Sequence, residues 1–174
     1  MAEIIKGNTE VIDGIQKLCT EPHKVAQDSF GNAFYWFLLT EPEGILKAAN
    51  ILHKPGARLA MICAYNEQAR HMQDACYEFV LEGTVYNVTV HMDAQHDFVP
   101  SITPVFANAD WHEREMMELY GIKVKGHPDP RRLFLDETLD AGLLGQIVPL
   151  SIVMNGASST DLWERILSDK EARS

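Results

Sequence analysis

The sequence predicts an α+β fold, in which an antiparallel sheet carries helices packed on one face and an irregular C-terminal extension follows. Apolar and polar residues alternate on both sides of a glycine over residues 76–92, which indicates an antiparallel strand pair with one wet face. Apolar residues at helical spacing lie before, between and after the predicted strands. The order helix, strand, helix, strands, helix is typical of a sheet with helices on one face.

The N-terminal half holds two helices and two strands. A short amphipathic helix is predicted over about residues 9–19, and residues 33–40 are rich in aromatic side chains, as in a buried strand. Pro42 opens a second helix, which Pro55-Gly56 ends. Residues 57–64 follow as the next strand. The apolar positions of the two helices are Val11, Ile12, Ile15, Leu18, Ile45, Leu46, Ala49 and Leu52.

The hairpin over residues 76–92 is the clearest local prediction. Gly83 supplies the turn between its two strands. The apolar positions that alternate with polar ones are Tyr77, Phe79 and Leu81 before the turn, and Tyr86, Val88, Val90 and Met92 after it.

A last helix is predicted over residues 110–120. Asp110 can cap this helix together with Glu113, three residues later, as a variant of the capping box. Gly121 stands where a helix end needs a residue that tolerates positive φ. Residues 121–135 then contain two prolines, two glycines and four basic residues against one acidic residue, so they form an irregular basic segment.

Size and composition indicate one domain. A chain of 174 residues with 46% apolar residues can bury a core. We expect residues 1–137 to form a single α+β domain and residues 138–174 to form the extension.

Charge narrows the classes of partner. The net charge of −10 and the pI near 5.1 exclude nucleic acid, whose phosphates need a basic face, and disfavour an anionic membrane surface. We see no signal peptide, and the longest apolar run, residues 33–39, is far shorter than the roughly 20 residues that cross a bilayer. We therefore expect a cytoplasmic protein that is at most peripheral to a membrane.

The three cysteines, Cys19, Cys63 and Cys76, form no CxxC motif. We expect free, buried thiols in a reducing compartment. Iron–sulfur clusters generally need four cysteine ligands, so we expect no cluster in this chain.

Motifs for metal or nucleotide binding are incomplete. His112-Glu113 starts the zinc-protease pattern HExxH, but its fifth position is Met116. No glycine-rich nucleotide motif occurs, and no catalytic triad stands out. We therefore expect no catalytic residue, cofactor or metal in this chain. A second set of potential metal ligands consists of His91, Asp93 and His96. This set lacks a convincing fourth ligand.

The last helix and the basic segment carry the candidate interaction residues. Arg114 lies one turn from both Asp110 and Glu118, so the spacing places it between two carboxylates. We expect Trp111 to wedge the helix against its neighbours. Arg131 and Arg132 can fork onto carboxylates, and a proline-stiffened loop loses little entropy when it docks. A solvated charged face and an ordinary surface turn also explain these residues.

The run over residues 99–137 resembles the C-subunit family of respiratory complex I (NADH dehydrogenase) and the related membrane-bound or energy-converting hydrogenases and formate hydrogenlyases. Strands from residue 57 onward resemble the family's preceding strands. The matching residues are Val99, Pro100, Ser101, Thr103, Pro104, Asn108, Trp111, Glu113, Arg114, Glu115, Tyr120, Gly121, Ile122, Gly126, His127, Pro128, Arg131 and Arg132.

The resemblance implies a structural subunit without a redox centre. It implies a place in the peripheral arm, on the inner face of the cell membrane, against a large catalytic subunit and a small iron–sulfur subunit. The partners would carry iron–sulfur clusters, and a NiFe centre in a hydrogenase; residues 138–174 would pack on them. The interface residues implied are Trp111, Glu113, Arg114, Glu115, Tyr120, Gly126, His127, Pro128, Arg131 and Arg132.

Two departures from the family pattern bear on the branch. Glu118 replaces the usual aspartate, and residues 146–151 lack the arginine and lysine common in complex I. The Glu118 change is minor. The lack of that arginine and lysine is the more serious departure, and the brevity of the chain together with the form Asp129-Pro130-Arg131-Arg132 favours the hydrogenase or formate hydrogenlyase branch, with the C subunit of an NADH:quinone oxidoreductase as the alternative. Two other classes remain open: a free-standing metal-dependent hydrolase, and an acidic interaction module unrelated to electron transfer.

Overall fold

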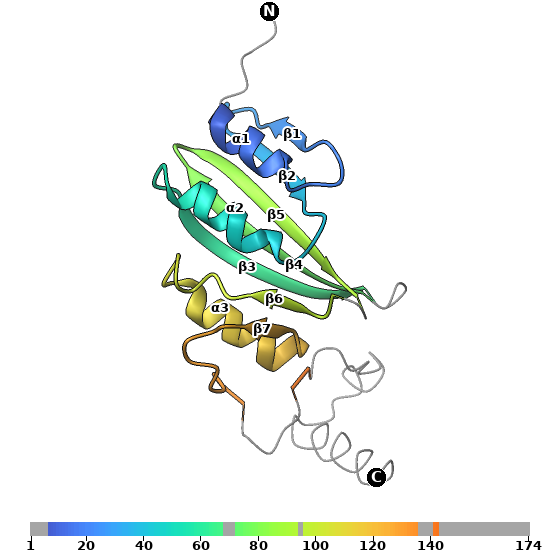
Figure 1. Ribbon diagram of the computed structural model, residues 1–174. Coiled ribbons are helices and arrows are strands. Elements are labelled where there is room, and N and C mark those ends of the chain that lie inside the picture. The colour runs from blue at the N-terminus through green and yellow to red at the C-terminus, as the bar shows by residue number, and fades with distance from the viewer. Residues whose placement is uncertain (1–6, 68–71, 94–95, 136–140, 143–174) are drawn as a thin grey trace, which may run out of the picture.

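The computed structural model describes residues 7–67, 72–93, 96–135 and 141–142. Within them it confirms the predicted α+β fold, with a mostly antiparallel sheet and helices on one face (Figure 1). The proposed extension, residues 138–174, lies outside the described residues except for Ala141 and Gly142. In chain order the elements are α1 (Thr9–Gln16), β1 (Lys24–Gln27), β2 (Ala33–Leu38), α2 (Gly44–His53), β3 (Arg58–Glu67), β4 (Met72–Leu81), β5 (Thr84–Met92), β6 (Phe98–Pro100), α3 (Ala109–Glu115), the π-helical turn η2 (Met116–Tyr120) and β7 (Lys123–Lys125).

The main sheet has the strand order β1-β2-β5-β4-β3. All its neighbours pair antiparallel except β2 and β5, which are parallel. The pairing of β2 with β5 is thus the one parallel pair in this otherwise antiparallel sheet, and the sequence does not predict it. After β2 the chain passes through α2, β3 and β4 before it returns as β5, and no local pattern encodes that return.

Helices α1 and α2 lie against the same face of the sheet (Figure 1). The predicted alternation is confirmed in the hairpin, where Tyr77 and Phe79 are fully buried. The turn residues Glu82 and Gly83 have φ of 49° and 78°, as in the primed turns that match strand twist. The largest buried side chains on this side include Ile15, Phe37, Ile45, Leu52, Tyr77, Phe79 and Tyr86.

Strand β1 is absent from the sequence-based prediction. It is a four-residue edge strand with exposed Lys24 and Val25, so it shows no buried alternation. Strand β3 extends to Glu67 rather than residue 64, and α1 ends at Gln16 rather than residue 19. Cys63 is exposed, which corrects the expectation that all three thiols are buried; Cys19 and Cys76 are half-buried.

Helix α3, the turn η2 and the short parallel pair β6-β7 lie beyond the β3 edge of the sheet (Figure 1). The Nδ2 of Asn108 donates to the carbonyl of Leu59 on β3, at 3.0 Å, and the Nε2 of Gln73 on β4 donates to the carbonyl of Tyr120, at 2.7 Å. The ring of Phe106 packs on Phe79, with centroids 5.2 Å apart. These contacts attach the family-like segment to the core. Among the described residues, no helix has the length and hydropathy needed to cross a membrane.

Candidate functional site

The predicted helix over residues 110–120 is confirmed as α3 followed by η2, and Gly121 ends it with φ of 70°. The predicted cap is wrong. The helix starts at Ala109 after Asn108, whose side chain makes no capping hydrogen bond, and Asp110 lies inside the first turn. Glu113 therefore has no role in a capping box and is free to bind another part of the chain.

Glu113 is fully buried and binds the loop after β6. Its Oε2 accepts hydrogen bonds from the Ser101 hydroxyl at 2.6 Å and the Thr103 hydroxyl at 2.9 Å, and its Oε1 accepts from the Ile102 N–H at 2.6 Å. A buried carboxylate needs such donors, because burying a charge without them is costly. Glu113 thus fixes residues 101–103 to α3.

His127 joins a third segment to the same carboxylate. Its buried ring accepts a hydrogen bond at Nδ1 from the Asp129 N–H, at 3.0 Å. The ring proton of the neutral imidazole therefore lies on Nε2. Nε2 faces the Asp110 carbonyl at 3.3 Å, Asp110 Oδ1 at 3.5 Å and Glu113 Oε2 at 3.6 Å. Gly126, with φ of 79°, turns the chain from β7 into this position.

Glu118 binds the backbone of the basic segment. Only 3% of the residue is exposed, and its carboxylate accepts hydrogen bonds from the N–H groups of Leu133, Phe134 and Leu135, at 2.5–3.0 Å for the shortest contact of each. Burial by itself raises the pKa of Glu118, but these backbone donors outweigh it and the pKa is lowered from its ordinary value.

Arg114 binds the carbonyl groups of the same segment. Its Nε donates to the Arg131 carbonyl at 2.8 Å, its Nη2 donates to the Arg132 carbonyl at 2.7 Å, and its Nη1 lies 3.7 Å from Asp110 Oδ2. The predicted pairing with Asp110 is confirmed, whereas the Glu118 carboxylate binds backbone N–H groups instead. We call Arg114 and Glu118 the anchoring pair, and residues 131–135 the anchored segment.

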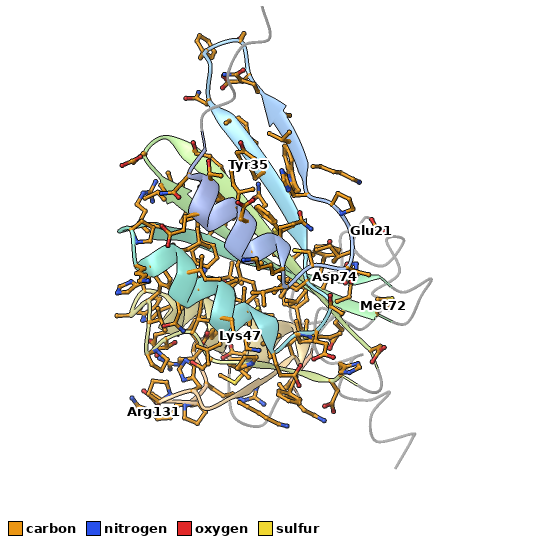
Figure 2. All side chains as sticks on the ribbon, turned by 45° about the horizontal axis from the view of Figure 1, so that its top comes forward. Glu21, Tyr35, Lys47, Met72, Asp74 and Arg131 are labelled. Carbon is orange, nitrogen blue, oxygen red and sulfur yellow. The ribbon has the colours of Figure 1, made fainter. Side chains whose placement is uncertain are left out.

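Three large side chains next to the anchoring pair face solvent. Trp111 is 64% exposed and Phe134 is 66% exposed, with ring centroids 6.4 Å apart in an edge-to-face arrangement. The Arg131 side chain is 81% exposed and lies at the margin of the molecule (Figure 2). The predicted wedging role of Trp111 is therefore wrong. We call Trp111, Arg131 and Phe134 the exposed cluster.

An internal ion pair orients Arg131. Its Nε and Nη2 donate to the two carboxylate oxygens of Asp129, at 2.7 and 2.6 Å. The hydrogen bond from the Arg131 side chain lowers the pKa of Asp129 to about 2. The guanidinium group is thus pre-positioned at the surface, with donors left over for another acceptor.

The remaining predicted site residues lie in the same region, with different environments. Glu115, Tyr120 and Arg132 are half-buried, and Pro128 is exposed. Sequence reasoning missed Phe134 in the exposed cluster and the binding of Glu118 to backbone N–H groups, since neither follows from residue type or spacing. Within the described residues, no three His, Cys, Asp or Glu side chains are grouped to hold a metal ion.

Comparison with known proteins yields a family match over most of the chain. The model of the family "Respiratory-chain NADH dehydrogenase, 30 Kd subunit" matches residues 38–155. The C subunit of the NADH-quinone oxidoreductase of Azorhizobium caulinodans is 30% identical over 157 residues, which is 87% of this chain and 72% of that protein. Its counterpart in Mesorhizobium japonicum is 46% identical over 68 residues, 37% of this chain and only 34% of that protein.

A solved structure shares the fold. A chain in the structure of the membrane-bound sulfane sulfur reductase, an archaeal respiratory membrane complex, superposes with a TM-score of 0.60 at 17% identity. The match covers 85% of this chain and 89% of that chain.

Proposed function

This chain belongs to the family of the 30 kDa subunit of respiratory-chain NADH dehydrogenase, and we propose that it is a non-catalytic docking subunit in the peripheral arm of a membrane-associated respiratory complex. In this proposal it holds the large catalytic subunit and the small iron–sulfur subunit in position. The redox cofactors belong to those partners, which is in keeping with the absence of any CxxC motif here. The chain meets the membrane only through the complex.

The observation that carries the proposal is the exposed cluster on an internally fixed support. Tryptophan and arginine are enriched among the residues that dominate binding at interfaces. Trp111 and Phe134 leave about two thirds of their surface in solvent, which is unusual for rings that need no partner. The anchoring pair already holds the backbone of residues 131–135, so little conformational entropy is lost on docking.

The relatives bear on the branch of the family. Both relatives described above are subunits of NADH-quinone oxidoreductases. This supports the alternative to the hydrogenase or formate hydrogenlyase branch that the sequence favours. We therefore propose that the partner complex is of the NADH:quinone oxidoreductase type.

Substitutions in the exposed cluster test the proposal. We expect Trp111→Ala, Phe134→Ala and Arg131→Ala each to reduce co-purification of the large subunit with the tagged chain. A loss of about 1.4 kcal/mol in binding free energy corresponds to about a tenfold weaker affinity, and residues that dominate an interface lose at least this much. The thermal midpoint of the isolated chain should stay nearly unchanged, since these side chains are exposed.

Two exposed side chains away from the site serve as matched controls. Phe30 is 89% exposed in the turn between β1 and β2, and Lys47 is exposed on α2. Phe30→Ala and Lys47→Ala should leave co-purification at the wild-type level. If the cluster variants recover the large subunit as well as the controls do, the cluster is not an interface.

A further inference from the structure

Two of the three cysteines face each other directly across neighbouring strands. Cys63 on β3 and Cys76 on β4 are register partners in the antiparallel ladder, so their side chains point to the same side of the sheet. Directly opposed residues have Cα atoms about 4.5 or 5.5 Å apart, depending on whether they exchange backbone hydrogen bonds. Both separations fall within the range of about 4.4–6.8 Å that a disulfide accepts.

We propose that Cys63 and Cys76 form a reversible redox modification site, in which a small disulfide compound oxidises the two thiols to a cross-strand disulfide. This inference does not depend on the proposed function. Nothing in the docking role uses either thiol. Helices α1 and α2 cover the face of the sheet that carries Tyr77 and Phe79, and both thiols lie on the opposite face.

The solvent exposure of each thiol decides which cysteine reacts first with the small disulfide. Cys63 is exposed, so its thiolate attacks the small disulfide, the S–S bond of that disulfide breaks, and one half leaves as a thiol. Cys76 is half-buried. Its thiolate then attacks the Cys63 sulfur and expels the second half. Two electrons and two protons pass from the protein thiols to the small disulfide, which becomes two free thiols.

The surroundings of Cys76 favour its role as the resolving thiol. The pKa of Cys76 is raised above its ordinary value. Burial is the main cause, Cys63 and Glu78 add to it, and a hydrogen bond with Thr89 acts in the opposite direction. Cys76 is therefore the poorer first nucleophile. The next cross-strand row on this face holds Asp74, whose Oδ1 lies 2.5 Å from His91 Nδ1; Figure 2 labels Asp74 near Met72, at the beginning of β4.

Strand geometry makes the disulfide easy to reduce. Opposed Cβ atoms in a sheet are about 4.5–5.5 Å apart, whereas a disulfide needs about 3.5–4.5 Å. The disulfide therefore requires the two Cβ atoms to lie at the short end of the sheet spacing, and a disulfide strained by this requirement has a more oxidising potential than a relaxed one. A modest excess of a small thiol should restore both cysteines.

Oxidation of the full-length chain with glutathione disulfide tests the proposal. We expect the mass of the monomer to fall by about 2 Da, two of its three thiols to resist alkylation, and proteolysis to yield a peptide pair linked through Cys63 and Cys76. Reduced glutathione should reverse all three changes.

Cysteine variants provide the controls. Cys19 lies outside the main sheet and its thiol contacts the Ile15 carbonyl at 3.3 Å, so Cys19→Ser should behave as the wild type. Cys76→Ser should stop at the mixed disulfide on Cys63, and Cys63→Ser should show no intramolecular disulfide. A trivalent arsenical, which bridges two nearby thiols, should bind the reduced wild type but neither of these two variants. Glutathione adducts without an internal disulfide in the wild type, a disulfide that includes Cys19, or covalent dimers would each overturn the proposal.

Discussion

Glu113 and Glu118 are both buried carboxylates on the same helical segment, and each binds a different stretch of chain. Glu113 accepts hydrogen bonds from residues 101–103, and Glu118 accepts them from residues 133–135. Trp111 on the same helix is mostly exposed, and its ring contacts Phe134 edge to face. At the scale of single residues, buried carboxylates position the segment, and the exposed aromatic rings carry the proposed docking role.

Glu113→Ala should strongly destabilise the isolated chain. The substitution leaves the Ile102 N–H and the Ser101 hydroxyl without their acceptor, and each buried unsatisfied group costs about 1–3 kcal/mol. Chemical denaturation should show a loss of about 3 kcal/mol in the free energy of unfolding. Glu115→Ala, two residues along the same helix at a half-buried position, should cost only about 0.5 kcal/mol. Equal losses for the two variants would mean that the Glu113 network contributes nothing specific.

Glu118 should contribute stability that depends on pH. Its pKa is lowered in the folded chain, so its stabilisation is complete above the ordinary value of 4.5 and is lost as the pH falls through the lowered folded value. Glu118→Gln keeps one acceptor oxygen and has no charge to lose. We expect the variant to be about 1–3 kcal/mol less stable than the wild type at neutral pH.

Thermal midpoints measured from about pH 7 down to about pH 3 check this dependence. The gap between the wild type and Glu118→Gln should narrow only at the acid end. Asp129 also has a lowered pKa, so Asp129→Asn is the control variant. It shows whether loss of any carboxylate with a lowered pKa produces the same change of thermal midpoint with pH. A gap that stays constant with pH would contradict the role assigned to the Glu118 carboxylate.

At the scale of the elements, the anchored segment depends on Arg114 as much as on Glu118. Arg114→Lys should keep the charge but lose the fork that binds the carbonyls of Arg131 and Arg132. We expect amide hydrogen exchange at residues 133–135 to speed up by about tenfold or more, since about 1.4 kcal/mol of local stability is lost. Exchange in the β4–β5 hairpin should not change, and Lys47→Ala should alter neither. Unchanged exchange at residues 133–135 would show that Glu118 alone anchors the segment.

The sequence predicts an element well when the pattern that produces it lies within the element itself. The hairpin is predictable because Tyr77 and Phe79 alternate with polar residues, and the helix end is predictable because Gly121 tolerates positive φ. Strand β1 escapes prediction because an exposed edge strand has no buried face. The parallel pairing of β2 with β5 escapes it because it joins residues about fifty positions apart.

The candidate site is predictable in position but not in detail. The run of family-like residues places every predicted site residue in one region of the fold. Its internal contacts depend on how the anchored segment folds back on α3, which spacing along one helix cannot show. This is why the sequence predicts a wedged Trp111, although the ring is mostly exposed, and why it places Glu118 beside Arg114.

At the scale of the whole molecule, the packed core is separate from the layer that carries the proposed docking surface. The sheet with α1 and α2 forms the core, and the layer of α3, η2, β6 and β7 is attached at the β3 edge through Asn108, Gln73 and Phe106 (Figure 1). Family membership and this arrangement both support a docking subunit. The docking claim concerns partners, so it is tested on the assembled complex.

The most direct test is to recover the tagged chain from detergent-solubilised membranes of its own organism and to identify the bound proteins by mass spectrometry. We expect stoichiometric recovery of a large catalytic subunit and a small iron–sulfur subunit of an NADH:quinone oxidoreductase. The exposed-cluster variants should lose both proteins, and Phe30→Ala should keep them. A large subunit with paired CxxC motifs for nickel would instead support the hydrogenase branch. Recovery of the chain alone, or with proteins unrelated to electron transfer, would show that it is not a docking subunit of a respiratory complex.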